Sequence, residues 1–144
     1  MQNLSKQERA EELEGLYDFA EGQGIKVYEY DMPKYGAMSI MDEKGRCFIG
    51  IDKEKKSKSE QKTMLLHELG HCLTGAFYNM YTPFCLRTKC ERRANEWAIE
   101  NYLPYDRLID AYKSGISTDY ELAQYFEVSE QFVRMAKEYY LQKR

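Results

Sequence analysis

The residues of this sequence best suited to catalysis are two histidines and a glutamate in one short stretch. The segment His67-Glu68-Leu69-Gly70-His71 reads H-E-x-x-H, and it contains both histidines of the chain. On a helix, residues four apart lie on one face, so two imidazoles can reach one metal ion. Glu68 is rotated by roughly 100° from His67 and can lie beside the metal without taking a ligand position. Zinc hydrolases use such a set of residues to bind and deprotonate a water molecule.

The sequence around the motif has the start and stop signals of a helix. Ser57 followed by Glu60 resembles a capping box, and Thr74-Gly75 supplies a C-terminal stop. Leucines give the segment a broad apolar surface, as expected of a helix buried in a domain. Gly70 lies inside this helix, where glycine costs up to about 1 kcal/mol relative to alanine. Close approach of another backbone or of a substrate would compensate. These features favour a metal site over two unrelated histidines that happen to be four apart.

A third protein ligand is needed, because a catalytic zinc usually has three protein ligands and a water. With no third histidine, a carboxylate or a thiolate must complete the set. Glu91 is the leading candidate, because it shares a helical face with Asn95 and small residues nearby would let that helix approach the motif. Asn95 would then orient a histidine through its free ring nitrogen. Glu96 lies on a different face and is the runner-up; either carboxylate could instead be a solvated charge paired with a neighbouring arginine.

The rest of the chain must supply the elements that hold this site. Besides the motif helix, we expect helices at residues 4–22, 90–103, 105–114, 118–126 and 129–141. We expect strands at residues 25–30, 36–41 and 46–51, the last two joined by a hairpin turn at 42–45, and irregular structure at 75–89. The sequence therefore predicts an α+β fold with a small antiparallel sheet packed on the motif helix. We divide it into a core, 1–104, and a C-terminal helical segment, 105–144, packed on that core.

Composition and charge narrow the function classes. Of the 144 residues, 43% are hydrophobic, which is enough for a core. The net charge of −3 does not indicate the positively charged surface that binds nucleic acid. No apolar run reaches the roughly 18 residues needed to span a bilayer, and the polar N-terminus does not read as a secretory signal. The cysteines form no C-x-x-C pair, so we expect reduced thiols and a cytoplasmic protein. Cys85 and Cys90 are alternatives for a disulfide or for metal binding.

The motif, followed at a distance by E-x-x-A-N-x-x-A from Glu91 to Ala98, resembles the ImmA/IrrE zinc metallopeptidases, peptidase family M78. Nineteen residues separate His71 from Glu91, which suits a glutamate-type zincin. The resemblance extends over most of the chain. It departs at Arg93, where the family often has a second glutamate, and at Trp97, where phenylalanine is commoner. Neither of these two residues is one of the proposed ligands.

The resemblance implies a zincin-like metallopeptidase core and a zinc endopeptidase activity. In such an enzyme His67, His71 and Glu91 would bind Zn²⁺. Glu68 would take a proton from water as general base and deliver it to the departing amine. The substrate implied is a helix-turn-helix repressor of a prophage or mobile element, whose cleavage relieves repression.

Two details of this site stay open in the sequence. A further donor would stabilise the oxyanion of the reaction, and Tyr78, Tyr81 and Tyr102 are candidates among which nothing decides. Two histidines and a glutamate favour zinc, although manganese or iron could occupy such a site.

The C-terminal segment resembles half of a helix-turn-helix, with the pattern L-A-x-x-F-x-V-S at residues 122–129. Its second helix carries Arg134 and Lys137 but also Glu138, and this nearly neutral balance does not suit phosphate binding. We therefore expect the two helices to pack or to dock substrate, and we expect no nucleic-acid partner. Two alternative functions are kept: a zincin-fold regulatory protein that binds a partner without cutting it, and a DNA-binding regulator. The intact Glu68 speaks against the first and the charge balance against the second.

Overall fold

The computed structural model describes residues 13–31, 36–52, 54 and 57–143. The helices in this part of the chain are α2 (Leu13–Gly22), α3 (Lys58–Thr74), α4 (Phe84–Tyr102), α5 (Tyr105–Lys113), α6 (Asp119–Phe126) and α7 (Glu130–Gln142). The strands are β1 (Lys26–Glu29), β2 (Ala37–Met41) and β3 (Cys47–Ile51). Together they make the α+β fold that the sequence predicts. The expected helix at 4–22 is seen from Leu13 onward, and residues 4–12 lie outside the described part.

The three strands form one mixed sheet in the order β1-β3-β2. β2 and β3 are the antiparallel hairpin that the sequence predicts, and Gly45 takes the left-handed conformation in its turn, with φ +79°. β1 pairs with the other edge of β3 in parallel, so the sheet differs from the purely antiparallel one expected. The chain reverses direction before β2 and again at the hairpin, which gives β1 and β3 the same direction. β3 takes the centre because its side chains at alternate positions are buried.

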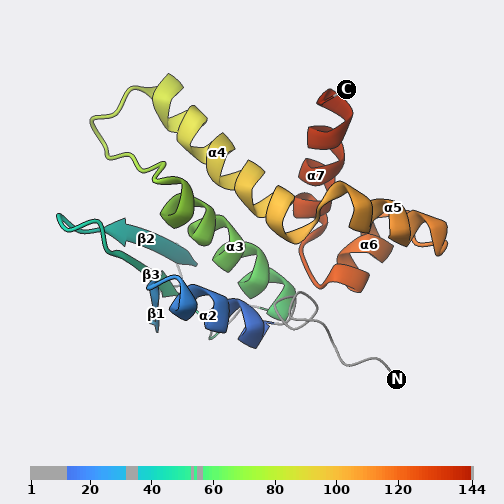
Figure 1. Cartoon of the computed structure of the whole chain (residues 1–144), viewed down its shortest axis with the longest axis horizontal. Helices are drawn as coiled ribbons and strands as arrows, with labels where there is room; N and C mark the ends of the chain where they lie inside the picture. Colours follow the sequence, from blue (N-terminus) through green and yellow to red (C-terminus); the bar gives the residue numbers. More distant parts are fainter. Residues whose placement is uncertain (1–12, 32–35, 53, 55–56, 144) are drawn as a thin grey trace.

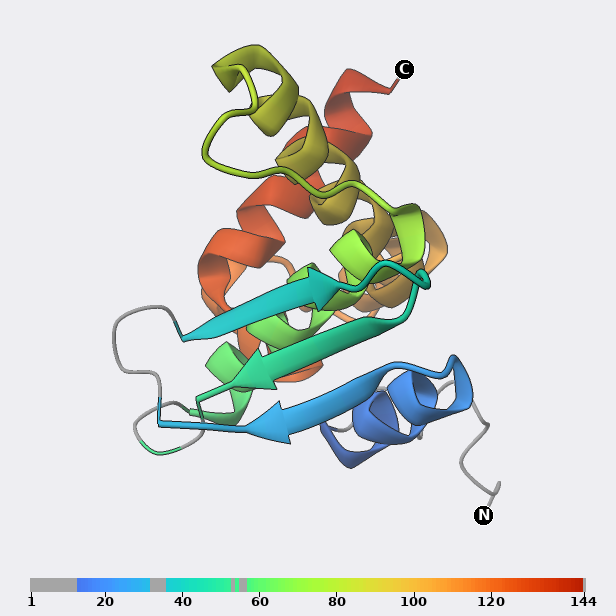
Figure 2. The ribbon, with the colours of Figure 1, turned by 90° about the vertical axis from the view of Figure 1, so that its left-hand side faces the viewer.

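The motif helix α3 lies at the centre of the molecule (Figure 1). It packs on β2 and β3 on one side and on α4 on the other, and α2 contacts its flank. Figure 2 shows the sheet in front of α3, with α4 and α7 behind. Leu65, Leu66 and Leu69 of α3 are almost completely buried. The side chains of α3 are therefore held from both sides, as a site that needs fixed geometry requires.

Gly70 allows α4 to approach α3 closely. A Cβ atom at this position would lie 2.3 Å from the carbonyl oxygen of Ala94 and 2.8 Å from its carbonyl carbon. Both are backbone atoms, which cannot move away as the end of a flexible side chain can. The close backbone approach expected from a helical glycine is confirmed, and the neighbour is the turn of α4 that carries Glu91 and Asn95.

Gly70→Ala is therefore expected to destabilise the protein, although alanine is the better helix former. Overpacking of this kind costs about 1–3 kcal/mol, more than the roughly 1 kcal/mol gained in helix propensity. Thermal unfolding of the two proteins measures the difference. Gly22→Ala is the matched control, because a methyl group there meets no atom within 4 Å. An unchanged melting temperature for Gly70→Ala would show that α4 does not lie this close to α3.

α4 begins six residues earlier than the sequence analysis expects, at Phe84 instead of residue 90. Pro83 precedes it, and the Pro83 carbonyl accepts the backbone N–H groups of Leu86 and Arg87, 3.0 Å away in both cases. Proline suits this position because it has no N–H to leave unsatisfied and its φ is preset. The expectation of irregular structure holds for residues 75–83. The longer helix places Arg87 one turn before Glu91.

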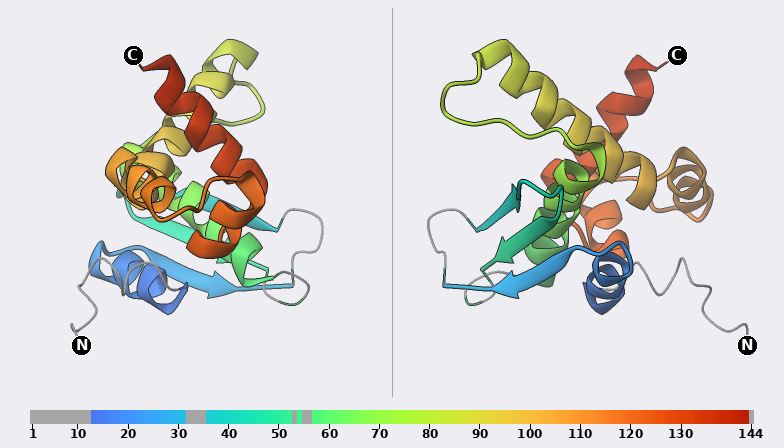
Figure 3. Two further views of the ribbon diagram at one scale, coloured as in Figure 1. Left: turned by 90° about the vertical axis from the view of Figure 1, so that its right-hand side faces the viewer. Right: turned by 60° about the vertical axis from the view of Figure 1, so that its left-hand side comes forward.

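The helices α5, α6 and α7 pack against one end of α3 and α4 (Figure 3). Thr118 caps α6 in a complete capping box, and Ser129 caps α7. Lys62 of α3 donates its Nζ hydrogen bond to the Phe126 carbonyl oxygen, 3.0 Å away. The Ser129 N–H donates to Thr63 Oγ1, also at 3.0 Å. One buried apolar cluster runs from α2 to α7. The boundary at residue 104 stays a prediction.

Cys47 of β3 and Cys72 of α3 form a disulfide, where the sequence analysis expects reduced thiols. The packing of the sheet on α3 brings their Cα atoms to 5.8 Å, within the range that a disulfide spans. The two residues are 25 positions apart, so no local spacing indicated the pair. Cys85 and Cys90, the pair considered from the sequence, are both free. None of the described helices is both long enough and apolar enough to cross a membrane.

Candidate metal centre

His67, His71 and Glu91 converge on one point between α3 and α4, and we call them the His-His-Glu cluster. The Nε2 of His67 lies 2.8 Å from Glu91 Oε2, and the Nε2 of His71 lies 3.1 Å from Glu91 Oε1. The two Nε2 atoms are 3.1 Å apart. One ligand atom from each residue falls within 4.8 Å of the others. The structure thus brings together the three residues that the sequence proposes as ligands, and Glu96 is not among them.

The other ring nitrogen of each histidine is held by an acceptor. The Nδ1 of His67 lies 2.7 Å from Asn95 Oδ1, as the sequence analysis expects for Asn95. The Nδ1 of His71 lies 2.6 Å from the carbonyl oxygen of Ala76, an acceptor that the sequence did not reveal. A carbonyl oxygen can only accept, so in each neutral ring Nδ1 carries the proton and Nε2 keeps its lone pair. Metal-binding histidines are commonly oriented in this way.

The donor set of the cluster fits a zinc ion. Two Nε2 lone pairs and a carboxylate point at the same small volume. When both rings are neutral, no proton lies between these atoms to form a hydrogen bond. Such an arrangement is repulsive unless a cation or added protons lie at its centre. Two imidazole nitrogens and a carboxylate oxygen are an established ligand set for catalytic zinc, with one position left open. The three residues could therefore hold Zn²⁺.

Glu68 lies beside the cluster but takes no part in it. Its side chain is largely buried, and the hydroxyl of Ser39 donates a hydrogen bond of 2.7 Å to its Oε1. Ser39 belongs to β2, which the packing of the sheet brings to α3. Nothing in the sequence indicated this contact, because it joins residues 29 positions apart in different elements. Ser39 fixes the orientation of the carboxylate that the sequence proposes as the base.

Tyr78 is the one tyrosine of the three candidates that reaches the cluster. Its hydroxyl donates a hydrogen bond of 2.8 Å to Glu91 Oε1. Tyr81 is 87% exposed and is not among the residues that line the site. The hydroxyl of Tyr102 is committed to the Phe126 carbonyl oxygen, 2.8 Å away in the buried core. Tyr78 is therefore the candidate donor that the geometry favours.

An open cleft of about 680 Å³ contains the cluster, and we call it the cluster cleft. Its walls come from β2, α3, α4 and the loop between α3 and α4. The lining residues are Ala37, Met38, Ser39, His67, Glu68, His71, Phe77, Tyr78, Asn79, Met80, Arg87 and Glu91. A cleft of this kind leaves room for an extended peptide beside the cluster.

A comparison with known protein families gives one match. The family model described as the IrrE N-terminal-like domain, Peptidase_M78, matches residues 20–136. The chain belongs to the M78 peptidase family. Neither the search of curated proteins nor the search of solved structures found a match. Membership of the M78 family indicates a metallopeptidase of the ImmA/IrrE type, and the matched residues include the His-His-Glu cluster.

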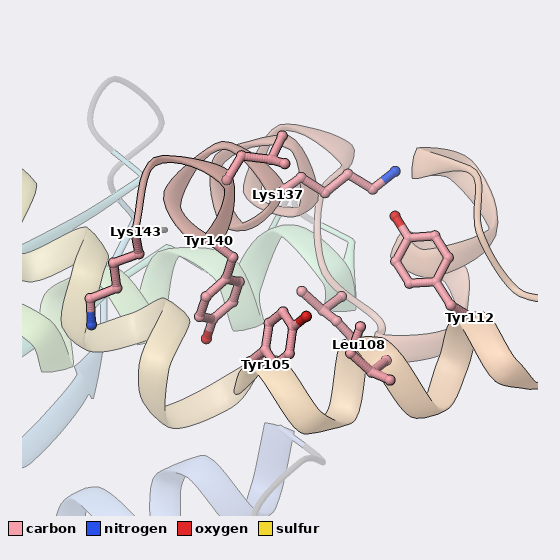
Figure 4. Close-up of a pocket in the computed structure, with 8 residues that line it drawn as sticks. Tyr105, Leu108, Tyr112, Lys137, Tyr140 and Lys143 are labelled. Atoms are coloured by element: carbon pink, nitrogen blue, oxygen red, sulfur yellow. The ribbon is translucent and has the colours of Figure 1, made fainter.

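The M78 domain has a second hollow, which shares no lining residue with the cluster cleft. It lies between α5 and α7, has a volume of about 610 Å³, and is shown in Figure 4. Tyrosine, leucine, isoleucine and lysine side chains line it, namely Tyr105, Leu108, Ile109, Tyr112, Lys137, Tyr140, Leu141 and Lys143. None of these is a histidine or a carboxylate, so this hollow offers no hydrolytic chemistry. Of these two hollows, the cluster cleft is therefore the candidate active site.

In the metal-free M78 domain, the three residues of the cluster shift one another's pKa values. Hydrogen bonds from His67 and His71 hold the pKa of Glu91 well below its ordinary 4.5. Burial lowers the pKa of both imidazoles, but the hydrogen bond and charge of Glu91 outweigh it, and each pKa lies above the ordinary 6.5. In the metal-free protein, a protonated imidazole and the ionised Glu91 therefore stabilise each other, while the charge of His67 opposes protonation of His71.

This coupling predicts the pH at which the metal-free protein is most stable. The contribution of Glu91 is present above about pH 4.5 and is lost as the pH falls through its lowered pKa. The contribution of the imidazoles is present below about pH 6.5 and is lost as the pH rises through their raised pKa values. We expect the melting temperature in chelator to peak between these values, and to depend less on pH in Glu91→Ala. A wild-type maximum above pH 8 would contradict this coupling.

Proposed function

We propose that this protein is a zinc-dependent endopeptidase that cleaves a helix-turn-helix repressor of a prophage or mobile element. The observation that carries the proposal is the convergence of His67, His71 and Glu91 in an open cleft, with Glu68 beside them. Family membership supplies the peptidase class, and the cluster supplies the ligand set. Substrate, metal and location are the parts that we propose.

In the proposed hydrolysis, different residues bind the metal, act as the base and stabilise the oxyanion. A zinc ion held by the cluster would supply the Lewis acid that activates a water and polarises the peptide carbonyl. Glu68, oriented by Ser39, takes the proton of the attacking water and passes it to the nitrogen of the departing amine. The Tyr78 hydroxyl, which reaches the cluster, would donate to the negative charge that develops on the carbonyl oxygen.

The edge of the sheet offers a place for an extended substrate. β2 pairs only with β3 among the described strands, so its other edge is unpaired there, and its residues Ala37, Met38 and Ser39 line the cluster cleft. A peptide can add to such an edge through main-chain hydrogen bonds, which do not depend on its sequence. Met38, Phe77 and Met80 provide apolar contacts for its side chains. This arrangement favours a peptide in extended conformation, such as an unfolded or flexible segment of a repressor.

The alternatives have less support. A protein that only binds a partner has no use for a buried carboxylate oriented beside a metal-binding cluster, as Glu68 is. A DNA-binding role needs free positive charge on α7. Instead, Lys137 forms an ion pair of 2.6 Å with Asp119, and Arg134 lies 3.8 Å from the same carboxylate. We therefore propose a protein substrate and no nucleic-acid partner.

Incubation with the candidate repressor tests the proposal. The zinc-loaded protein is mixed with a helix-turn-helix repressor from the same prophage or mobile element, and the products are analysed by mass spectrometry. We expect two fragments from a single internal cut, and no cut in the presence of a chelator. Complex formation without cleavage would favour the binding alternative.

We also propose a cytoplasmic site of action, although the Cys47–Cys72 disulfide does not favour it. The redox state of these two cysteines in cells tests this location.

A further inference from the structure

Arg87 brings a permanent positive charge to the cluster cleft. It lies on α4 one turn before Glu91, and it is the single arginine or lysine among the described residues that line this cleft. Its guanidinium carbon lies 6.0 Å from the centre of the Phe84 ring. A smaller hollow of about 250 Å³, also lined by Tyr78 and Thr88, opens at the same place. The charge therefore lies where a substrate in the cleft would pass.

No carboxylate of the described residues pairs with Arg87. Glu91 is four residues away, a spacing that commonly gives helical ion pairs, but its two carboxylate oxygens face the imidazoles. Glu68, the other carboxylate of the cleft, accepts the hydroxyl of Ser39. The Nε of Arg87 is buried, and it has no hydrogen-bond partner within the part of the chain that the structure describes.

The buried Nε–H of Arg87 is unsatisfied until an acceptor binds it. A buried N–H group without a partner is unfavourable, because it has lost its hydrogen bonds to water. A carboxylate is the best partner, because its two oxygens match the planar guanidinium and accept two parallel hydrogen bonds.

We propose that Arg87 binds a carboxylate of the substrate, so that the enzyme prefers peptides with Asp or Glu close to the cleaved bond. The inference rests on the proposed peptidase function and adds a substrate class to it. A side-chain carboxylate and the C-terminal carboxylate of a peptide share this chemistry. Since an endopeptidase cuts inside the chain, the side chain is the source that we expect.

Matched peptides test this preference. Cleaved bonds are first identified in a random peptide library, and peptides with Glu or Gln are then compared at each position flanking the bond. Each is made with a free and with an amidated C-terminus. We expect kcat/KM to be at least about tenfold higher for Glu than for Gln at one position, as for a hydrogen bond between charged groups. Amidation should leave this ratio unchanged.

Variants of Arg87 assign the preference to this side chain. Arg87→Gln should reduce the Glu-to-Gln ratio to about one, Arg87→Lys should keep part of it, and zinc content should stay the same in both. Arg92→Gln is the control, because Arg92 is exposed on the same helix and does not line the cleft. An equal loss on both peptides, or a ratio that survives Arg87→Gln, would overturn the proposal.

A binding measurement separates this inference from the proposed function. Glu68→Gln protein with zinc should bind the Glu peptide more tightly than the Gln peptide, whether or not the wild type cuts either. If no peptide or repressor is cut, the peptidase proposal fails, while unequal binding still supports the carboxylate site. Equal binding with normal cleavage would overturn the carboxylate site alone.

Discussion

Glu68→Gln protein is expected to keep its zinc and to lose peptide hydrolysis. The carboxylate lies outside the His-His-Glu cluster, and its contact is with the Ser39 hydroxyl. The amide keeps the shape of the side chain and can still accept the hydrogen bond of Ser39, but it cannot take a proton from water. A general base commonly contributes 10²- to 10⁴-fold, so kcat should fall by about that factor.

Zinc analysis and a peptide assay on the same samples measure this effect. The expected pair of results is about one zinc per chain in both proteins and hydrolysis only in the wild type. Ser39→Ala is a useful companion, because it removes the hydrogen bond but keeps the carboxylate, and it should lower the rate by less. Cleavage at the wild-type rate by purified Glu68→Gln would rule out Glu68 as the base.

Glu91→Ala protein is expected to lose both zinc and activity. Glu91 contacts both imidazoles and the Tyr78 hydroxyl, so its removal deletes one of three ligands and loosens the remaining two. Changes outside the ligand set usually cost 10- to 100-fold in metal affinity. Loss of a ligand should cost more than about 100-fold. Competition with a chelator of known affinity measures the difference.

Glu96→Ala is the matched control for this experiment. Glu96 has the same chemistry, lies on the same helix and was the second candidate from the sequence, but it is not part of the cluster. Its zinc affinity should equal that of the wild type. Asn95→Ala should fall between the two, because it removes only the acceptor for His67 Nδ1. Equal zinc affinity in Glu91→Ala and Glu96→Ala would show that the third ligand is another residue.

The residues of the cluster could be proposed as ligands from the sequence because helical periodicity places each pair on one face. His67 and His71 are four apart, and Glu91 and Asn95 repeat that spacing on a second helix, so each pair shares one face. Gly70 carried a second signal, since a helical glycine needs a reason, and Ala94 provides it. The helix caps at Ser57 and Gly75 were predicted for the same reason, as local chemistry of the backbone ends.

The remaining parts of the site depend on contacts between distant elements. Ser39 reaches Glu68, and Cys47 reaches Cys72, only because the sheet packs on α3, and no spacing in the sequence encodes that distance. The parallel pairing of β1 depends on which edge of β3 is free, which strand patterns do not reveal. The early start of α4 comes from Pro83, which precedes the first helical residue and lies outside the apolar pattern that predicts a helix from residue 90.

Zinc titration of the metal-free wild-type protein tests the central claim most directly. The rate of peptide hydrolysis is measured as zinc is added in substoichiometric steps. If the His-His-Glu cluster holds the catalytic ion, the rate should rise in proportion to the zinc added and level off at one equivalent per chain. Full hydrolysis by the metal-free protein, or none after one equivalent has bound, would contradict the account.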